Sequence, residues 1–292
     1  MNAKEQATAR ESRRERAAAR LLARGRPLEL DRTSGPVWVV AAHPGEEALA
    51  CGGLIARSAA QHVRVRIAFL TSGEWSHRRQ LAAAEMGPLR EAEAIAAAAA
   101  LGVQPEDVHF IRSPDTAAAF DRPRAERLMR TLFDTALPGL LVLPDDSDRH
   151  PDIAAAHRVA RAAAAFVGAA PLVVEYPYWA WRVWPFVRAP LPLPWQGGEE
   201  SRDRAGVIAA SVRHRLGREL VRRFPSVLEP GGSTVAKAAA VAAHRSQMEH
   251  RGGDPGWWTL RDVNRGDFLD RLLRSPERYR VTTPADSIRR LA

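Results

Sequence analysis

The sequence has little cysteine, little lysine and no long apolar run. Cys51 is the only cysteine, which excludes an intrachain disulfide framework and favours a reducing compartment. No apolar stretch reaches the ~18 residues that a membrane-spanning helix needs. Residues 1–26 are charged throughout and lack the apolar core of a signal peptide. We therefore expect a cytoplasmic protein without a transmembrane segment.

Lys4 and Lys237 are the only lysines, so arginine supplies nearly all of the positive charge in a chain of formal net charge +9. A basic balance of this kind favours nucleic acids, anionic membranes or anionic ligands as partners. The sequence carries no nucleic-acid-binding motif, and an arginine- and alanine-rich composition accounts for the charge. We therefore expect no nucleic-acid partner, and the sequence leaves the oligomeric state open.

Short apolar runs alternate with alanine-rich helical patterns between residues 36 and 176. This alternation predicts a Rossmann-like α/β fold with a mainly parallel sheet and helices on both faces. The periodicity predicts strands at 37–42, 63–71, 108–111, 139–143 and 172–176, and helices near 47–60, 80–101, 122–136 and 152–168.

The two ends of the chain depart from this pattern. Residues 1–27 are rich in Ala, Arg and Glu and end with Gly25 and Pro27, which predicts a polar helical arm. From about residue 177 the chain is irregular and rich in Trp and Pro, and it then becomes helical again. We therefore predict one domain over residues 28–292, preceded by the arm at 1–27.

Polar residues gather where two of the predicted strands end. The first strand runs into the sequence His-Pro-Gly-Glu-Glu, and the fourth is followed by acidic residues and a histidine. Ligand sites of open α/β sheets lie outside the carboxyl ends of the strands, so these side chains are expected to meet. Histidine nitrogens and carboxylate oxygens suit Zn²⁺ and similar ions. The two strand ends therefore predict a metal site, with candidates His43, Glu46, Glu47, Asp145, Asp146, Asp148, His150 and Asp152.

Both strand ends resemble motifs of the PIG-L/LmbE-like family of zinc-dependent N-acetyl-sugar deacetylases. That family carries Ala-His-Pro-Asp-Asp-Glu after its first strand and His-Pro-Asp-His after a later one. This sequence reads Ala-His-Pro-Gly-Glu-Glu at 42–47 and His-Pro-Asp-Ile at 150–153. The resemblance covers about residues 36–280, and its further segments are Gly52-Gly53, 70–74, Arg90 with Glu93, Pro114-Asp115, 175–177 and 243–247.

The resemblance implies a role for each matched residue. His43 would bind zinc, Glu46 would take the place of the second ligand, and His150 would stabilise the oxyanion or transfer a proton. Hydrolysis of an N-acetyl group needs these functions, because the carbonyl must be polarised, a water activated and the leaving amine protonated. The residues implied to contact the substrate are Arg90, Asp115 and Asp152.

Two matched positions lack the side chain that the family uses. Gly45 stands at the position of the general base, and Ile153 stands at that of the third zinc ligand. His157, one helical turn after Ile153, is the candidate replacement ligand. Asp148 is the candidate replacement base, with Glu47 as an alternative base or a structural residue. We therefore expect zinc binding to be weak or absent.

The sequence supports two functional hypotheses. The first is a metal-dependent N-deacetylase-like hydrolase that acts on an N-acetylated amino sugar or glycoconjugate. The second is a catalytically degenerate homologue that binds a carbohydrate or a partner protein without turnover. A group of tryptophans predicts either a sugar-stacking wall or a hydrophobic packing cluster, and its members are Trp179, Trp181, Trp184 and Trp195.

Overall fold

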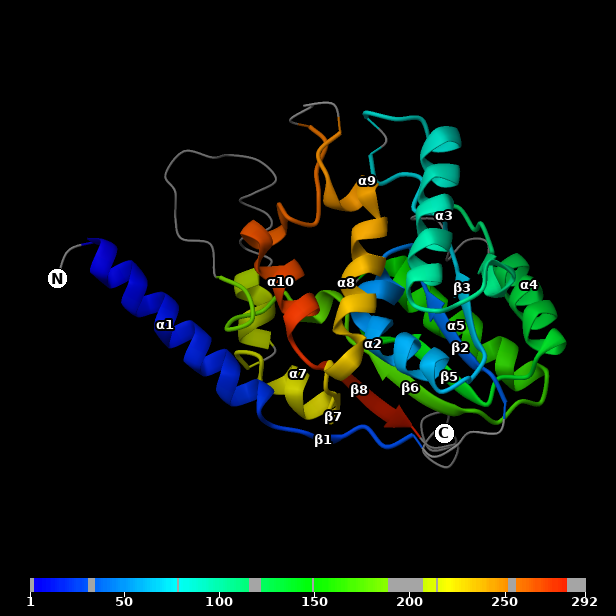
Figure 1. The fold of residues 1–292 in the computed structure, drawn as a ribbon, viewed down its shortest axis with the longest axis horizontal. Coiled ribbons are helices and arrows are strands. Elements are labelled where there is room, and N and C mark those ends of the chain that lie inside the picture. The colour runs from blue at the N-terminus through cyan, green and yellow to red at the C-terminus, as the bar shows by residue number, and fades with distance from the viewer. Residues whose placement is uncertain are drawn as a thin grey trace.

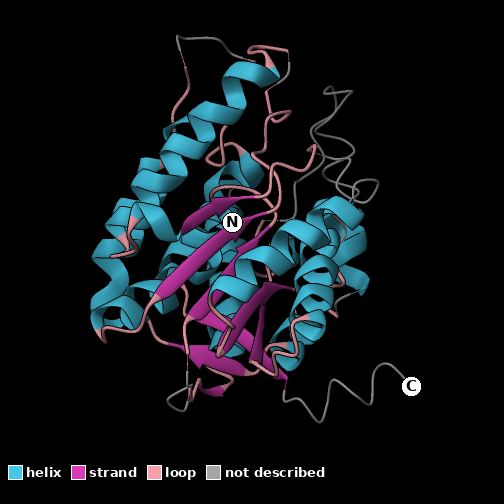
Figure 2. Ribbon diagram, turned by 90° about the vertical axis from the view of Figure 1, so that its right-hand side faces the viewer, coloured by secondary structure: helices cyan, strands magenta, loops and turns pink. Residues whose placement is uncertain are grey.

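An eight-stranded mixed sheet, of order β1-β7-β8-β6-β5-β2-β3-β4, runs through the centre of the protein. The computed structural model describes residues 3–30, 35–77, 79–115, 122–148, 150–188, 207–213, 215–251 and 256–282. Helices lie on both sides of the strands (Figure 2), so the fold is α/β, as the sequence predicts. The strands are β1 (Arg26–Pro27), β2 (Val37–Ala41), β3 (Val65–Phe69), β4 (Val108–Phe110), β5 (Leu140–Pro144), β6 (Leu172–Tyr176), β7 (Ser226–Leu228) and β8 (Glu277–Thr282).

The neighbouring strands β6, β5, β2, β3 and β4 run parallel, and they are the strands that the sequence predicts. Every residue of β2 and β5 is buried, because helices cover both faces of the sheet, and this explains their continuous apolar runs. Parallel strands point their carboxyl ends toward the same edge. The loops after β2 and β5, which are direct neighbours, are therefore brought together.

The strands β1, β7 and β8 are outside the predicted set. β8 pairs antiparallel with both β6 and β7, and β1 pairs parallel with β7. β8 begins with Glu277, a buried carboxylate that accepts hydrogen bonds from Lys237 Nζ at 2.7 Å and from the backbone N–H of Gly53 at 2.7 Å. A buried charge that distant residues satisfy leaves no apolar pattern in its own strand. The sequence therefore gives no strand signal there.

The helices form two groups around the sheet. α2, α3 and α8 pack together, and α4 packs against α5 (Figure 1). Among the described residues, no helix combines the length and the apolar character that crossing a membrane requires. The α-helices are α1 (Ala3–Leu22), α2 (Glu46–Ala60), α3 (Ala83–Ala100), α4 (Arg122–Thr135), α5 (Pro151–Phe166), α7 (Arg218–Arg223), α8 (Thr234–Ala243), α9 (Arg245–Met248) and α10 (Asp267–Arg274). A further helical stretch covers 207–213, and 3₁₀ turns are η1 (Pro105–Asp107), η2 (Trp179–Trp181), η3 (Gly231–Ser233) and η4 (Val263–Gly266).

The predicted N-terminal arm corresponds to α1, and its second half is docked on the body. Arg14 donates hydrogen bonds to the carbonyl oxygens of Pro185 and Phe186, both at 3.2 Å. Arg278 of β8 donates to the carbonyl oxygen of Leu22 at 2.7 Å, at the end of the helix. Ala18 is fully buried between these contacts. Ion pairs of Arg14 with Asp267 and of Glu15 with Arg271 add to these contacts, so the arm is held by polar interactions and a narrow apolar contact.

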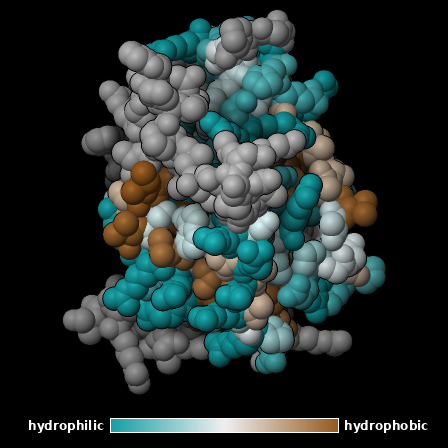
Figure 3. Space-filling view, turned by 90° about the vertical axis from the view of Figure 1, so that its left-hand side faces the viewer, coloured by the Kyte–Doolittle hydropathy of each residue, from teal (hydrophilic) through white to brown (hydrophobic). Residues whose placement is uncertain are grey.

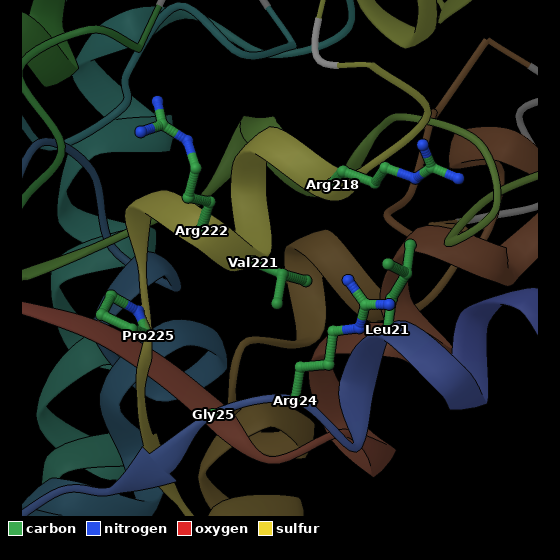
Figure 4. Close-up of a pocket in the computed structure, with 7 residues that line it drawn as sticks. All are labelled: Leu21, Arg24, Gly25, Arg218, Val221, Arg222 and Pro225. Carbon is green, nitrogen blue, oxygen red and sulfur yellow. The ribbon is translucent and has the colours of Figure 1, made fainter.

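A hollow of about 450 Å³ lies between the C-terminal end of α1 and α7 (Figure 4). None of its lining residues belongs to either strand-end motif. The hollow is therefore not the site that the sequence predicts. Its lining includes the apolar Leu21, Val221 and Pro225 with Arg24, Arg218 and Arg222. On the molecular face at the left of Figure 1, hydrophobic side chains are separated by hydrophilic ones (Figure 3).

Glu175 of β6 is a buried carboxylate that ties three elements together. It accepts hydrogen bonds from Arg280 Nε at 2.6 Å and Thr282 Oγ1 at 3.0 Å, and His157 Nε2 lies 2.9 Å away. Burial opposes ionisation of Glu175, but the hydrogen bonds and charges of His157 and Arg280 outweigh it and hold its pKa well below the usual value. The folded state therefore prefers the ionised form.

A Glu175→Gln variant is expected to lower the free energy of unfolding by about 1–3 kcal/mol at pH 7, because the buried Arg280 loses one charged partner and keeps only Asp145 and Asp146. The folded pKa lies below the unfolded one, so the carboxylate contributes its stability above the usual glutamate pKa of about 4.3 and loses it as pH falls. Urea unfolding at pH 7 and pH 4 should show that the free energies of unfolding of the wild type and the variant differ less at the lower pH. The control Asp270→Asn removes an exposed ion pair and should cost at most about 1 kcal/mol. Equal costs for both variants would contradict the buried role of Glu175.

Candidate metal and catalytic site

His43 and His150 meet at the carboxyl ends of β2 and β5, as the strand pattern predicts. Their ring centroids lie 4.8 Å apart at an interplanar angle of 87°. His43 lies two residues beyond the end of β2, and His150 immediately precedes α5, whose first residue is Pro151. Proline at the first helical position favours a helix start there, because its fixed φ suits the helix and its missing N–H would be unpaired anyway. The two histidines therefore share one site.

Three carboxylates converge on the imidazole of His43. Glu46 Oε1 lies 2.7 Å from Nδ1, while Asp115 Oδ1 and Asp152 Oδ2 lie 3.1 and 3.2 Å from Nε2. Burial alone would lower the pKa of His43, but hydrogen bonds with Asp115, Asp152 and Glu46 raise the pKa well above its usual value. The side chains around Nε2 thus carry an excess of negative charge, which favours a cation.

Among the described residues, His43, His150 and Asp152 form one group whose ligand atoms all lie within 4.8 Å of one another. Two imidazoles and one carboxylate are a ligand set that suits zinc. Glu46 lies instead behind His43, where it also accepts a hydrogen bond from the backbone N–H of Ala42 at 3.0 Å. A carboxylate in that place orients a metal-binding histidine through its other nitrogen. The residue types of this group therefore fit a zinc ion.

The predicted replacement ligand His157 lies one turn further along α5, and it contacts Glu175. It is not part of the group that His43 forms with His150 and Asp152, within the residues that were described. Ile153, at the third ligand position of the family motif, is fully buried in the hydrophobic core. The arrangement therefore brings Asp152, which the sequence assigned to the substrate, to the two histidines in place of His157.

Asp148 is held in the loop between β5 and α5 by two backbone groups. Oδ1 accepts a hydrogen bond from the N–H of His150 at 3.1 Å, and Oδ2 accepts one from the N–H of Trp179 at 3.0 Å. Burial raises the pKa of Asp148 to about 7, against the effect of its hydrogen bond with His150. Burial and the charge of His43 lower the pKa of His150. A carboxyl group that titrates near neutrality therefore lies directly beside the site.

Arg90 and Asp115, which the resemblance implies to contact a sugar, both form hydrogen bonds within the protein. The buried guanidinium of Arg90 donates hydrogen bonds to the carbonyl oxygens of Gly73 at 3.0 Å and Pro44 at 2.6 Å, and so joins the loops after β3 and β2. Asp115 uses one oxygen on His43 and the other on the N–H of Trp75, at 3.0 Å. Both residues hold the site together, and their contact with a sugar stays a prediction.

Gly45 has a φ of +103°, and the space beside it is filled by Gln247, the last residue of the segment 243–247 that resembles the family. A Cβ at this position would lie 2.8 Å from Gln247 Nε2 and 3.1 Å from Gln247 Oε1. The Gln247 amide donates a hydrogen bond to the carbonyl oxygen of Pro44 at 3.0 Å. Glu47 accepts the Gly45 N–H at 2.7 Å and lies 2.8 Å from His244 Nε2. Glu47 therefore holds the loop in shape, and a carboxamide takes the space next to the absent side chain.

The aromatic residues after β6 pack against one another. Trp179 stacks on Phe268 with ring centroids 5.0 Å apart and an angle of 11°, and Trp181 meets the edge of Phe186 at 5.0 Å. These contacts favour the packing cluster over the sugar-stacking wall. Trp195 lies outside the described residues.

The family model described as PIG-L, GlcNAc-PI de-N-acetylase, matches residues 38–164. A comparison with curated proteins finds no match. Similar solved structures include an N,N'-diacetylchitobiose deacetylase from Pyrococcus horikoshii, which is 17% identical with a TM-score of 0.57 over 86% of this chain and 84% of that one. The 4-carboxy-2-hydroxymuconate hydratase GalB from Pseudomonas putida is 18% identical with a TM-score of 0.56 over 86% and 97% of the two chains. A triple mutant of a deacetylase from the teicoplanin biosynthetic pathway is 18% identical with a TM-score of 0.54 over 85% and 98%.

At these identities, the solved structures establish the fold and leave the reaction open, since one of them is a hydratase. The family match is more specific, because it spans both strand-end motifs, from the loop after β2 to the start of α5. The same two motifs place His43 and His150 side by side. The match to the PIG-L family therefore covers the part of the chain, residues 38–164, that carries both motifs.

Proposed function

We propose that this protein is a metal-dependent N-deacetylase that acts on an N-acetylated amino sugar or glycoconjugate in the cytoplasm. The observation that carries the proposal is the convergence of His43, His150 and Asp152, whose ligand atoms lie within 4.8 Å of one another at the carboxyl ends of β2 and β5. The family description, GlcNAc-PI de-N-acetylase, supports the reaction type. The chitobiose deacetylase with the same fold supports an amino-sugar substrate.

His43, His150 and Asp152 would hold the metal, which is zinc in this proposal. When bound, zinc polarises a carbonyl group and activates water. Glu46 keeps the His43 ring oriented through Nδ1, and Asp115 holds the loop after β4 against the same ring. The proposal assigns His150 to metal binding in place of the oxyanion or proton-transfer role that the resemblance implies.

Asp148 is the proposed general base, because Gly45 has no side chain at the position that the family uses. Asp148 lies two residues before His150 and is fixed by the backbone of that residue. A carboxylate there would accept the proton of the attacking water and return it to the leaving amine. Its two hydrogen bonds also hold the loop in place.

An Asp148→Asn variant is expected to retain metal but release acetate about 10²–10⁴-fold more slowly, which is the usual contribution of a positioned base. Metal content by mass spectrometry and acetate release from N-acetylglucosamine derivatives measure the two effects separately. Asp146→Asn is the matched control, since Asp146 lies in the same loop but pairs with Arg223 at 2.9 Å. Equal rates for the Asp148 and Asp146 variants would remove Asp148 from the mechanism.

The second candidate function is a catalytically degenerate protein that binds a carbohydrate or a partner protein without turnover. It is favoured by Gly45, beside which the Gln247 amide takes up the space, and by Ile153, which is buried in the core. The hydratase of the same fold supports the view that this fold is not tied to deacetylation. Sugar binding in a calorimeter, together with no acetate release by metal-loaded protein, would favour this function over the first.

A further inference from the structure

Trp75 and Trp258 differ from the other described tryptophans because each exposes about half of its surface. Their exposed fractions are 45% and 52%, while Trp38, Trp181 and Trp257 are buried. An indole is a large apolar group that proteins usually bury or use in recognition. Two exposed indoles in the same part of a protein therefore indicate a ligand-binding surface.

The two tryptophans belong to loops that are bonded to each other. Trp75 lies in the loop after β3, and Trp258 lies in the loop before η4. His77 of the first loop lies 2.7 Å from the carbonyl oxygen of Trp258, and its ring stacks on Trp257 with centroids 4.2 Å apart. Gln80 donates a hydrogen bond to the carbonyl oxygen of Gly256 at 2.9 Å. Both loops rise at the upper end of the molecule in Figure 1, so they form one surface.

This surface is attached directly to the His43 site. The backbone N–H of Trp75 donates to Asp115 Oδ2 at 3.0 Å, and Asp115 Oδ1 lies 3.1 Å from His43 Nε2. Glu74, the residue before Trp75, accepts the N–H of Asp115 at 2.8 Å. One carboxylate thus separates the backbone of Trp75 from the candidate metal ligand, so the loop after β3 borders the His43 site.

We propose that Trp75 and Trp258 form a carbohydrate platform that binds the sugar next to the N-acetylated one. The proposal rests on the proposed function, since it takes the ligand of the site to be a sugar or glycoconjugate. The apolar face of an indole accepts the C–H face of a sugar ring, while polar neighbours accept and donate hydrogen bonds to its hydroxyl groups. Ser76 and Arg79, both exposed in the loop after β3, supply such neighbours.

A polar surround distinguishes this surface from a membrane-binding one. Lipid headgroup recognition requires a cluster of four or more lysines or arginines beside the apolar anchor, roughly as polybasic segments provide it. The sequence of this loop, residues 70–82, includes two arginines, Arg78 and Arg79, no lysine, and the acidic Glu74, which is fewer cations than such a cluster needs. The loop after β3 therefore suits a neutral hydroxylated ligand better than an anionic membrane.

The test compares the binding of N,N'-diacetylchitobiose and N-acetylglucosamine to the full-length protein by calorimetry and by quenching of tryptophan fluorescence. Trp75→Ala and Trp258→Ala should each weaken binding of the disaccharide about five- to tenfold and change binding of the monosaccharide less. Trp75→Phe should restore most of the affinity, because it keeps an aromatic face. Phe166→Ala, which removes an aromatic residue that is 67% exposed at the far end of α5, is the matched control and should change neither.

Each outcome decides the proposal. Disaccharide binding that the double variant Trp75→Ala with Trp258→Ala leaves unchanged would overturn it, as would wild-type protein that binds neither sugar. If the wild-type protein binds phosphatidylcholine–phosphatidylserine vesicles, and the double variant loses this binding while sugar binding stays intact, the surface would be assigned to a membrane instead. Tryptophan-dependent disaccharide binding without acetate release would uphold the platform and count against the deacetylase function, so the two failures are distinguishable. Unchanged thermal unfolding of the variants shows that they remain folded.

Discussion

A His43→Ala variant is expected to lose its bound metal and its deacetylase activity together. The imidazole contacts Glu46 through one nitrogen and Asp115 and Asp152 through the other. Its loss removes a ligand and leaves three carboxylates close together without their shared partner. Loss of a residue that merely orients a ligand costs about 10–100-fold in metal affinity or activity. Removal of the ligand itself should therefore cost at least about 100-fold in both.

His157→Ala is the matched comparison for His43→Ala. His157 contacts Glu175 at 2.9 Å and lies outside the group formed by His43, His150 and Asp152. We expect this variant to retain its metal and to lose stability, because Glu175 loses a hydrogen-bonding partner. Metal analysis and acetate release, measured for both variants after the same purification, separate the two assignments. Metal lost from the His157 variant and kept in the His43 variant would reverse them.

The parallel half of the sheet follows directly from the sequence, because its strands are buried on both faces. Val37–Ala41 and Leu140–Pro144 are continuous apolar runs bounded by glycine, proline and charged residues, and such runs have few other interpretations. β8 is different, since Glu277 and Arg278 stand at its start and both are buried. Arg278 is satisfied by the carbonyl oxygens at the end of α1, more than 250 residues away in the chain. A local pattern cannot reveal a partner at that distance.

The candidate site was predictable to the level of strands and loops. The position of His43 and His150 after neighbouring strands followed from the order of the motifs. Which carboxylate faces which nitrogen of His43 depends on side-chain rotamers, and Glu46 and Asp152 could not be assigned from their spacing alone. Gln247 is a similar case, because it reaches Gly45 from about 200 residues further along the chain through tertiary packing.

The tryptophans show the same dependence on tertiary packing. Composition drew attention to the cluster after β6, where Trp179 and Trp181 are packed against phenylalanines. The sequence around Trp75 does not indicate recognition, because a single aromatic residue in a polar loop belongs to no periodic pattern. Its exposure and its bond to Asp115 are properties of the folded chain. Burial, which decides between packing and recognition, is set by the tertiary fold.

Gly45 is the position at which a substitution is expected to increase activity. Gly45→Asp alone should lower stability by about 1–2 kcal/mol and leave the rate unchanged, because φ is +103° and the new Cβ would lie 2.8 Å from Gln247 Nε2. Gly45→Asp combined with Gln247→Ala makes room for the carboxylate. This double variant should release acetate up to about 100-fold faster than Gln247→Ala alone, because both oxygens of the natural base Asp148 accept backbone N–H groups, whereas the new carboxylate would stand at the position that the family uses.

The matched control in this series is Gln247→Ala, since it loses the hydrogen bond to Pro44 without gaining a carboxylate. The rates are compared at equal metal content, so that a change in metal affinity is not mistaken for a change in the base. A faster double variant would mean that the natural site is limited by the missing carboxylate at residue 45. Equal rates for the double variant and Gln247→Ala, with measurable turnover, would assign proton transfer to Asp148. Rates near zero for both variants would favour the non-catalytic, sugar-binding function, because a restored base cannot help a site that lacks a metal to activate water.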